Sequence, residues 1–170
     1  MVVVEIPKDK EGLGSEFPHC DSLQLGMIIL FFVVWGLDSF VFDYSTALAG
    51  LVPLPLRLFL AVLPLSVGVY FGAKSHEVIF GEERHRPVLI DSGVYSRVRH
   101  PMYLGILMFC LGFFSVVPSL LSLGVWVAFF ILYDRMAAYE EKDLVRLLGD
   151  EYTAYQKRVP KWLIRLRTKD

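Results

Sequence analysis

A polar segment rich in basic and aromatic residues, residues 85–105, has the sequence HRPVLIDSGVYSRVRHPMYLG. Proline is favoured in the first turn of a helix, so Pro101 predicts a helix that begins here with His100 at its N-cap. The unpaired N–H groups and the positive dipole of that first turn would form an anion site, with Arg97 and Arg99 adding positive charge. The simpler alternative is that both arginines only anchor the segment outside the membrane.

Neighbouring residues of this segment offer further binding groups. Tyr103 would present a hydroxyl in the first turn of the expected helix, and Gly105 permits close approach of a ligand or of another helix. Residues 88–90 precede an Asp-Ser-Gly turn and are consistent with a short extended stretch. Extended backbone beside an aromatic ring such as Tyr95 can hold a flat heterocycle, although a plain loop explains the same residues.

A pair of carboxylates, Glu140 and Glu141, follows a long apolar run. A carboxylate here could accept hydrogen bonds from ribose hydroxyls or face a cationic ligand. Alternatively, the two acids open an amphipathic helix over residues 141–148, whose N-terminal dipole favours negative charge. Adjacent helical side chains point about 100° apart, so one of the two would face a site and the other the solvated side.

The composition of the chain indicates that the helices positioning these groups belong to a membrane protein. The chain has 170 residues, of which 55% are hydrophobic and 21% charged, and its mean hydropathy is +0.50. Soluble domains are less apolar, so the composition predicts an all-α polytopic membrane protein with a single domain, residues 1–170. The net charge of −1 argues against a nucleic-acid partner. No HExxH or CxxC motif is present, so we expect no metal site.

Windows with few or no charged residues locate four candidate spans, at residues 22–37 (apolar again up to 42), 54–72, 101–117 and 120–139. Pro53 and Pro55 separate the first connection from the second helix, and Pro118 marks a tight turn between the last two. These last two segments form a hairpin that is short for two spans of about 20 residues each. A fifth membrane helix would have to be partial.

Lysine and arginine set the predicted orientation. Of the 17 such residues, only Arg57 lies outside the N-terminal arm, the 73–100 connection and the tail from residue 135 onward. The positive-inside rule therefore places both termini and the polar site in the cytoplasm. The membrane would be the cell membrane in a prokaryote and the endoplasmic reticulum in a eukaryote. The tail interleaves basic and apolar residues, which fits either a surface anchor or a lid.

Three motifs in register resemble a known family. They are SGVYSRVRHPMYLG at 92–105, Glu140-Glu141, and GDEYTAYQKRVPKW at 149–162. Together they resemble the isoprenylcysteine carboxyl methyltransferase family, and the chain resembles a prokaryotic-type member of it. This family belongs with the phospholipid N-methyltransferases among membrane methyltransferases. The resemblance covers residues 85–162. It implies S-adenosylmethionine as methyl donor and S-adenosylhomocysteine as product, in a cytoplasmic pocket formed by the loop, the hairpin and the tail.

Carried over motif by motif, the resemblance implies two groups of cofactor contacts. The nucleoside would meet Val88, Leu89, Ile90 and Tyr95. The methionine part would meet His100, Pro101, Met102 and Tyr103, with its carboxylate at the expected anion site. Glu140 would be the member of the carboxylate pair that touches the cofactor.

Two positions depart from the family pattern. The family usually has a histidine at the position of Pro87. Either His85 replaces it through a shift of the loop, or the contact is lost. The family also tends to have an acceptor-orienting arginine where this chain has Met136. Arg135 is the candidate catalytic substitute, although one residue turns a helical side chain by about 100°.

The resemblance implies an enzyme that methylates the carboxylate of a prenylated cysteine, or of a similar lipophilic acid that enters from the bilayer. A carboxylate is already ionised at pH 7 and needs no general base. The first alternative is methylation of a phospholipid amine, which requires a base because an ammonium must first lose a proton. A nicotinamide-dependent membrane reductase and a non-enzymatic membrane scaffold are the further alternatives.

Overall fold

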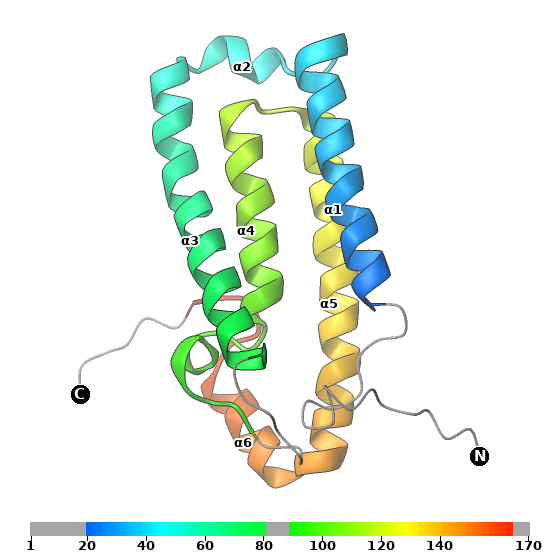
Figure 1. Ribbon diagram of the computed structural model, residues 1–170, viewed down its shortest axis with the longest axis vertical. Coiled ribbons are helices and arrows are strands. Elements are labelled where there is room, and N and C mark those ends of the chain that lie inside the picture. The colour runs from blue at the N-terminus through cyan, green and yellow to red at the C-terminus, as the bar shows by residue number, and fades with distance from the viewer. Residues whose placement is uncertain (1–19, 81–88, 165–170) are drawn as a thin grey trace.

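Figure 1 shows a bundle of long helices with short elements at both ends. The computed structural model describes residues 20–80 and 89–164, so the predicted contacts His85 and Val88 lie outside the described residues. Every regular element in these ranges is helical, which confirms the all-α prediction. The long helices are α1 (Cys20–Leu37), α3 (Leu54–Phe80), α4 (Pro101–Val116) and α5 (Leu120–Leu148). The short elements are the π-helical turn η2 (Asp38–Phe42), α2 (Ala47–Leu51), the 3-10 turn η3 (Gly93–Ser96) and α6 (Asp150–Arg158).

Three helical segments are long and apolar enough to cross a membrane. They are Cys20–Phe42 with 23 residues, Leu54–Val78 with 25 and Leu120–Leu148 with 29. The shorter α4 has 16 residues, which gives a length of about 24 Å against a hydrocarbon core of about 30 Å. All four predicted apolar helices are therefore present, and their lengths and composition indicate an integral membrane protein.

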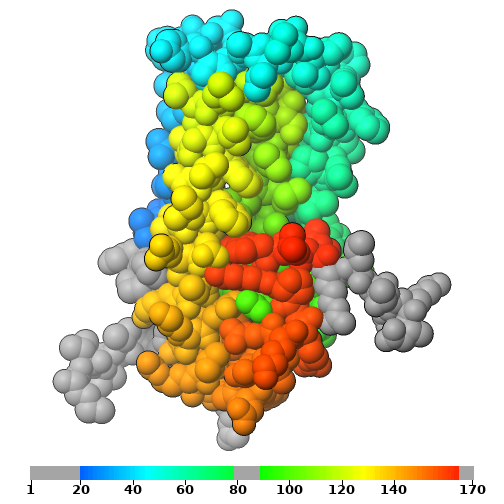
Figure 2. All heavy atoms as spheres, turned by 180° about the vertical axis from the view of Figure 1, so that it is seen from behind, coloured from blue at the N-terminus to red at the C-terminus, as the bar shows by residue number. Residues whose placement is uncertain are grey.

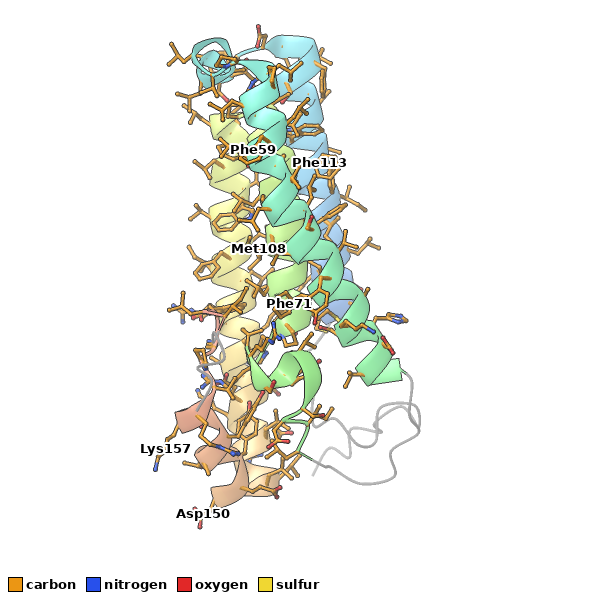
Figure 3. All side chains as sticks on the ribbon, turned by 90° about the vertical axis from the view of Figure 1, so that its left-hand side faces the viewer. Phe59, Phe71, Met108, Phe113, Asp150 and Lys157 are labelled. Atoms are coloured by element: carbon orange, nitrogen blue, oxygen red, sulfur yellow. The ribbon has the colours of Figure 1, made fainter. Side chains whose placement is uncertain are left out.

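Side chains divide the surface into apolar flanks and a polar end. Figure 3 shows apolar side chains such as Phe59 along the bundle, whereas Asp150 and Lys157 lie at the end that carries α6. Phe59 is 73% exposed, a value expected for a side chain that meets lipid rather than water. The groups available for polar chemistry therefore gather near α6.

Prolines fix the helix starts as predicted, but α3 and α5 run further than expected. α3 begins at Leu54 between two prolines and continues to Phe80 instead of residue 72, and Pro101 is the first residue of α4. α5 continues past residue 139 until Gly149, whose φ of 57° ends it. The prediction of a separate helix over 141–148 is therefore wrong, because no glycine or proline interrupts the chain between Gly124 and Gly149.

α3 and α4 cross with their backbones in close contact. A Cβ atom built on Gly68 would lie 2.9 Å from the carbonyl oxygen of Gly105 and 2.7 Å from the backbone nitrogen of Phe109. A Cβ atom built on Gly105 would lie 2.8 Å from the backbone nitrogen of Gly72. Small residues permit such approach between membrane helices, where burial from water supplies little attraction. Gly105 thus admits another helix, one of the two uses expected for it.

A second interface joins α1, α4 and α5 and is largely aromatic. Phe31 of α1 and Phe129 of α5 are completely buried in it. Trp126 of α5 donates its indole N–H to the carbonyl oxygen of Leu107 on α4, at 2.9 Å. The interface therefore fixes α5 against the helix whose first turn carries the predicted site.

The end of the bundle near α2 is closed by internal polar contacts. Asp38 is buried and accepts hydrogen bonds from Ser45 N at 3.0 Å and from Ser119 Oγ at 2.5 Å. Arg57 donates to the carbonyl oxygen of Val116 at 2.7 Å, near the end of α4. The hydrogen bonds of these polar groups are made within the protein. The candidate site lies at the opposite end of the bundle, beside α6 (Figure 1).

Candidate active site

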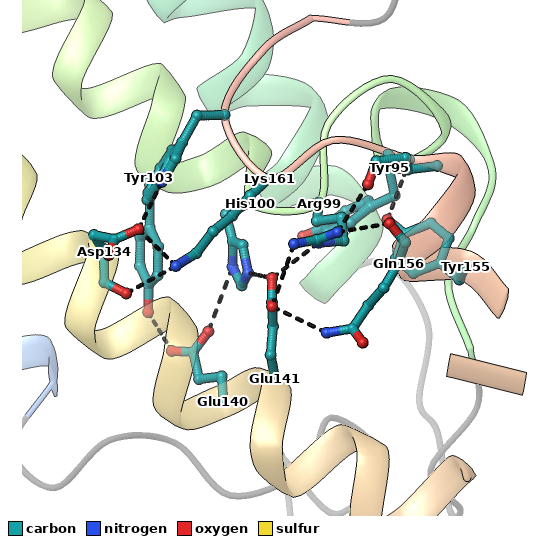
Figure 4. A network of polar contacts seen from close by, with 12 residues as sticks. Tyr95, Arg99, His100, Tyr103, Asp134, Glu140, Glu141, Tyr155, Gln156 and Lys161 are labelled. Carbon is teal, nitrogen blue, oxygen red and sulfur yellow. Dashed lines mark hydrogen bonds and ion pairs between the residues drawn. The ribbon is translucent and has the colours of Figure 1, made fainter. Parts of the chain in front are cut away.

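Residues from three helices meet where α4 begins (Figure 4). His100 is the N-cap of α4 and Pro101 is its first residue. Pro101 has no N–H to satisfy, and the N–H groups of Met102 and Tyr103 lie in the first turn, where intrahelical acceptors are missing. The sequence therefore predicted this helix start, and with it the direction of the helix dipole, correctly.

Glu141 of α5 is the most highly connected carboxylate of the site. Its oxygens accept hydrogen bonds from Arg99 Nε at 2.9 Å and from Gln156 Nε2 at 3.0 Å. His100 Nε2 lies 2.9 Å from the same carboxylate. The expectation that Glu141 faces the solvated side is wrong, because α6 folds back against α5 and covers it (Figure 4).

Arg99 joins the start of α4 to the end of α6. Its guanidinium holds Glu141 and also donates to the carbonyl oxygens of Gln156 and Val159, both at 2.9 Å. Its backbone N–H donates to the carbonyl oxygen of Pro160 at 3.0 Å. A cation suits the carbonyl end of a helix, so Arg99 caps α6 rather than standing open to a ligand.

Glu140 takes a different set of partners from its neighbour. It accepts a hydrogen bond from the hydroxyl of Tyr103, and one of its oxygens lies 3.7 Å from His100 Nδ1. The His100 and Tyr103 rings stack at 5.7 Å between centroids. Glu140 remains 20% exposed against 12% for Glu141. Of the two carboxylates, Glu140 is thus the more accessible to a ligand.

Tyrosines of α6 attach this helix to the loop before α4. Tyr155 donates its hydroxyl to the backbone carbonyl of Tyr95 at 2.7 Å. Tyr152 and Tyr155 are buried together, with Leu89 packed against them. Burial raises the pKa of both phenols above the ordinary value, so they remain neutral hydrogen-bond donors.

Residues 159–162, which we call the tail strap, cross the face of α5 after α6. Figure 2 shows this segment in red lying across α5 in yellow. Lys161 Nζ donates to Asp134 Oδ1 at 2.6 Å, and Trp162 Nε1 donates to the same oxygen at 2.9 Å. The strap therefore packs against α5, and Trp162 lies beside His100 with 6.0 Å between the ring centroids.

A family model described as phospholipid methyltransferase matches residues 49–151, more than half of the chain. The chain belongs to the phospholipid methyltransferase family. The matched range runs from α2 through α5 to the first residues of α6, and so includes the start of α4 and both glutamates.

Curated relatives carry two kinds of methyltransferase name. Protein-S-isoprenylcysteine O-methyltransferase of Schizosaccharomyces pombe is 30% identical over 73% of this chain and 51% of its own length. The protein of the same name in Homo sapiens is 33% identical over 52% of this chain and 32% of its own length. Methanethiol S-methyltransferase of Crocosphaera subtropica is 28% identical over 91% of this chain and 61% of its own. The chain thus spans about half the length of the first of these relatives.

The fold is similar to that of a solved membrane enzyme. The structure of the eukaryotic intramembrane Ras methyltransferase, isoprenylcysteine carboxyl methyltransferase, matches with a TM-score of 0.56 at 19% identity. The match covers 85% of this chain and 53% of that chain. At this identity the similarity concerns the fold, and it supports the prediction of a helical membrane protein.

In this member of the phospholipid methyltransferase family, most described residues predicted to bind the cofactor lie near one another. His100 and Tyr103 at the start of α4 contact Glu140 directly, whereas Tyr95 is joined to α6 through Tyr155. Leu89 packs on α6, and Ile90 beside it is half-buried. Neither Leu89 nor Ile90 makes a hydrogen bond to other backbone groups within the described ranges, so the extended stretch expected here stays a prediction.

Arg135 stands apart from this group. It is exposed on α5 and takes part in none of the hydrogen bonds found at the site among the described residues. Met136, at the position where the family resemblance expects an arginine, is completely buried. The assignment of Arg135 as an acceptor-orienting residue stays a prediction.

The sequence indicates Asp134 only as an acidic residue at the edge of a span near Glu140, and it does not single out Gln156 or Tyr133. Gln156 binds Glu141, Asp134 holds the tail strap, and Tyr133 stacks on Tyr103 at 4.4 Å between centroids. The spacing of seven residues between Tyr133 and Glu140 was an available signal, because such residues share a helix face. The contacts of Gln156 and Asp134 depend on how the tail folds back, which no local pattern specifies.

Proposed function

We propose that this chain is an S-adenosylmethionine-dependent methyltransferase that methylates the carboxylate of a prenylated cysteine or a similar lipophilic acid. The observation that carries the proposal is the contact of Glu140 with His100 and Tyr103 at the start of α4, at the polar end of a bundle of membrane helices. Family membership supports methyl transfer as the reaction class.

The residues present fit this cofactor in charge and in hydrogen-bonding capacity. First-turn N–H groups of α4 suit its carboxylate. Glu140 is partly exposed and suits ribose hydroxyls or a positive charge. Leu89 packs against the buried cluster that contains Tyr155, whose hydroxyl binds the backbone of Tyr95, so Leu89 and Tyr95 would offer a flat base an apolar and an aromatic surface. Arg99 and Glu141 would hold the surrounding elements in place without contacting the cofactor.

The reaction requires the protein mainly to position the acceptor and to exclude water. S-adenosylmethionine supplies an electrophilic methyl group on a positively charged sulfur. The acceptor carboxylate is already ionised, so the residues need only align it and keep water away. Tyr103, Leu107 and Met136 form a buried apolar wall next to the site, which favours a poorly solvated nucleophile.

The acceptor's apolar part would come from the bilayer, and the cofactor from the aqueous side. The exposed apolar flanks of the bundle are suited to lipid contact, and the site lies at the polar end. The excess of lysine and arginine at this end favours a cytoplasmic orientation. Both arguments support a reaction near the membrane surface.

A small thiol is the second candidate acceptor. The methanethiol S-methyltransferase relative matches 91% of this chain, against 73% for the fission yeast carboxyl methyltransferase. Met136 is also neutral where an arginine would orient a carboxylate. A thiol must lose its proton before it attacks, so His100 or Glu140 would act as base. A phospholipid amine would require the same base.

Ligand binding and methyl transfer by the purified full chain in nanodiscs test the proposal. We expect S-adenosylhomocysteine to bind in calorimetry and to raise the melting temperature, and NADPH to do neither. With S-adenosylmethionine, N-acetyl-S-farnesylcysteine should be methylated in preference to methanethiol and phosphatidylethanolamine. Binding of NADPH alone would favour a reductase, and binding of neither ligand would favour a scaffold. Preference for methanethiol would select the second candidate.

Glu140→Gln should weaken S-adenosylhomocysteine binding without unfolding the protein. Glutamine can still accept the Tyr103 hydrogen bond, so only the negative charge is lost. A hydrogen bond to a charged group contributes about 1.5–3 kcal/mol, so the dissociation constant should rise roughly 10- to 100-fold. Glu151→Gln, an exposed change of the same charge on α6, is the control. Equal effects of both variants in calorimetry would point to the overall potential instead of a contact.

A further inference from the structure

Tyr133 of α5 is completely buried, yet its hydroxyl has no hydrogen-bond partner in the described part of the chain. In these ranges only one other buried side-chain oxygen or nitrogen is in this state, Ser39 Oγ at the far end of the bundle. An unsatisfied buried polar group costs stability, and buried polar groups are normally paired. A phenylalanine at position 133 would fill the same space without this cost, so the hydroxyl calls for an explanation.

The position of Tyr133 links it to the proposed cofactor site. Tyr133 lies two helical turns before Glu140 on the same face of α5, about 10 Å further along the axis. Its ring stacks on Tyr103 at 4.4 Å with 19° between the planes, and the Tyr103 hydroxyl donates to Glu140. Tyr133 is therefore next to the cofactor-side network but further along α5, toward the apolar core of the bundle.

The Tyr133 hydroxyl is the one strong hydrogen-bond donor of its described surroundings that has no protein acceptor. The buried hydrophobic residues packed with Tyr133 are Cys20, Phe31, Tyr103, Leu107, Cys110, Phe129, Met136 and Ala137. The other strong donors packed in or on the cluster already have protein acceptors. Tyr103 donates to Glu140, Trp126 to Leu107 O and Trp162 to Asp134.

We propose that the Tyr133 hydroxyl binds the methyl acceptor by donating a hydrogen bond to its carboxylate. This inference rests on the proposed function and names the group that would orient the acceptor, at a place where Met136 supplies no charge. A lipophilic acid that enters from the membrane side would bring its carboxylate toward this part of α5. The hydroxyl is neutral and lies among apolar side chains, so it can orient the carboxylate with little competition from water.

The reaction balances without a proton. One carboxylate oxygen forms the bond to the methyl carbon as the sulfur–methyl bond breaks, and the electron pair of that bond stays on sulfur. The second carboxylate oxygen accepts the Tyr133 hydrogen bond throughout. The negative charge of the acid and the positive charge of the donor are both neutralised, and Tyr133 neither gains nor loses a proton.

The test compares Tyr133→Phe with Ser39→Ala, since each variant deletes one unpartnered buried hydroxyl at opposite ends of the bundle. Binding of N-acetyl-S-farnesylcysteine is measured by calorimetry in nanodiscs saturated with S-adenosylhomocysteine, and KM and kcat are measured with S-adenosylmethionine. For Tyr133→Phe we expect acceptor binding and KM to worsen by about 10-fold or more. S-adenosylhomocysteine binding should not change, and the melting temperature should stay level or rise.

Each outcome has a separate meaning. Equal acceptor binding by the wild type and Tyr133→Phe, with the melting temperature raised in the variant, would reduce Tyr133 to an unpaired core residue and overturn the inference alone. A wild type that binds S-adenosylhomocysteine but not N-acetyl-S-farnesylcysteine would overturn it together with the acceptor assignment. Weakened acceptor binding in Ser39→Ala to the same degree would also overturn it, because the effect would then not be local to the site.

Discussion

Arg99→Met should lower the free energy of unfolding by about 3–5 kcal/mol, the range for removing one partner of a buried ion pair. Arg99 and Glu141 are only 13% and 12% exposed, so the remaining carboxylate would stay largely buried. The variant also removes the donor that satisfies carbonyl oxygens of Gln156 and Val159 at the end of α6. We therefore expect α6 and the tail strap to detach from α5 at a lower temperature than the bundle melts.

Thermal unfolding of the full chain in detergent and limited trypsin digestion measure this effect. Cleavage after Lys157 or Arg158 should become fast in Arg99→Met at temperatures where the wild type resists it. Arg97→Met, an exposed change of the same charge two residues earlier, is the control and should behave as the wild type. If Arg99→Met melts and digests like Arg97→Met, the ion pair does not hold the tail. Arg99→Lys should rescue only in part, because lysine lacks the planar fork that reaches two acceptors.

The features that the sequence predicted correctly are those set by nearby residues. Pro101 fixes its own backbone angle and lacks an N–H, so it marks a helix start wherever it lies in the fold. Pro118 likewise separates α4 from α5, and the apolar windows identify helices because lipid requires internally bonded backbone. None of these inferences depends on a contact distant in the sequence.

The features that the sequence did not predict depend on distant contacts. Glu141 was expected on the solvated side because adjacent helical side chains point about 100° apart and the family resemblance assigns Glu140 to the cofactor. Its partners Arg99 and Gln156 lie 42 and 15 residues away, and they reach it only because α6 folds back. A local pattern carries no information about that return, although Gly149 and Pro160 do mark where the chain turns.

The roles of the two glutamates follow from the same geometry. Side chains about 100° apart on one helix were expected to divide between site and solvent. They divide instead between two partners, with Glu140 on Tyr103 of α4 and Glu141 on Arg99 and α6. The family resemblance selected Glu140 for the cofactor, and its greater exposure is consistent with that choice.

Gly68→Val should produce the other large loss, on the order of 3 kcal/mol, at the upper end for overpacking. The first added carbon would lie 2.7 Å from the backbone nitrogen of Phe109 and 2.9 Å from the carbonyl oxygen of Gly105. Backbone atoms cannot move aside as a flexible side chain can, so α3 and α4 must separate. Gly68 and Gly72 form a GxxxG pattern, a known signature of closely packed membrane helices.

Separation of α3 from α4 should also weaken ligand binding, because Gly105 lies two residues after Tyr103 and the first turn of α4 would shift with it. Melting in detergent and S-adenosylhomocysteine calorimetry should therefore both report a loss for Gly68→Val. Gly72→Ala is the matched control on the same helix, since a Cβ atom there meets nothing within 4 Å. Alanine is a better helix former than glycine by up to about 1 kcal/mol, so this control should melt level with the wild type or above it. Equal melting temperatures for Gly68→Val and Gly72→Ala would mean that α3 and α4 do not cross at Gly68, so the start of α4 would lie elsewhere relative to α3.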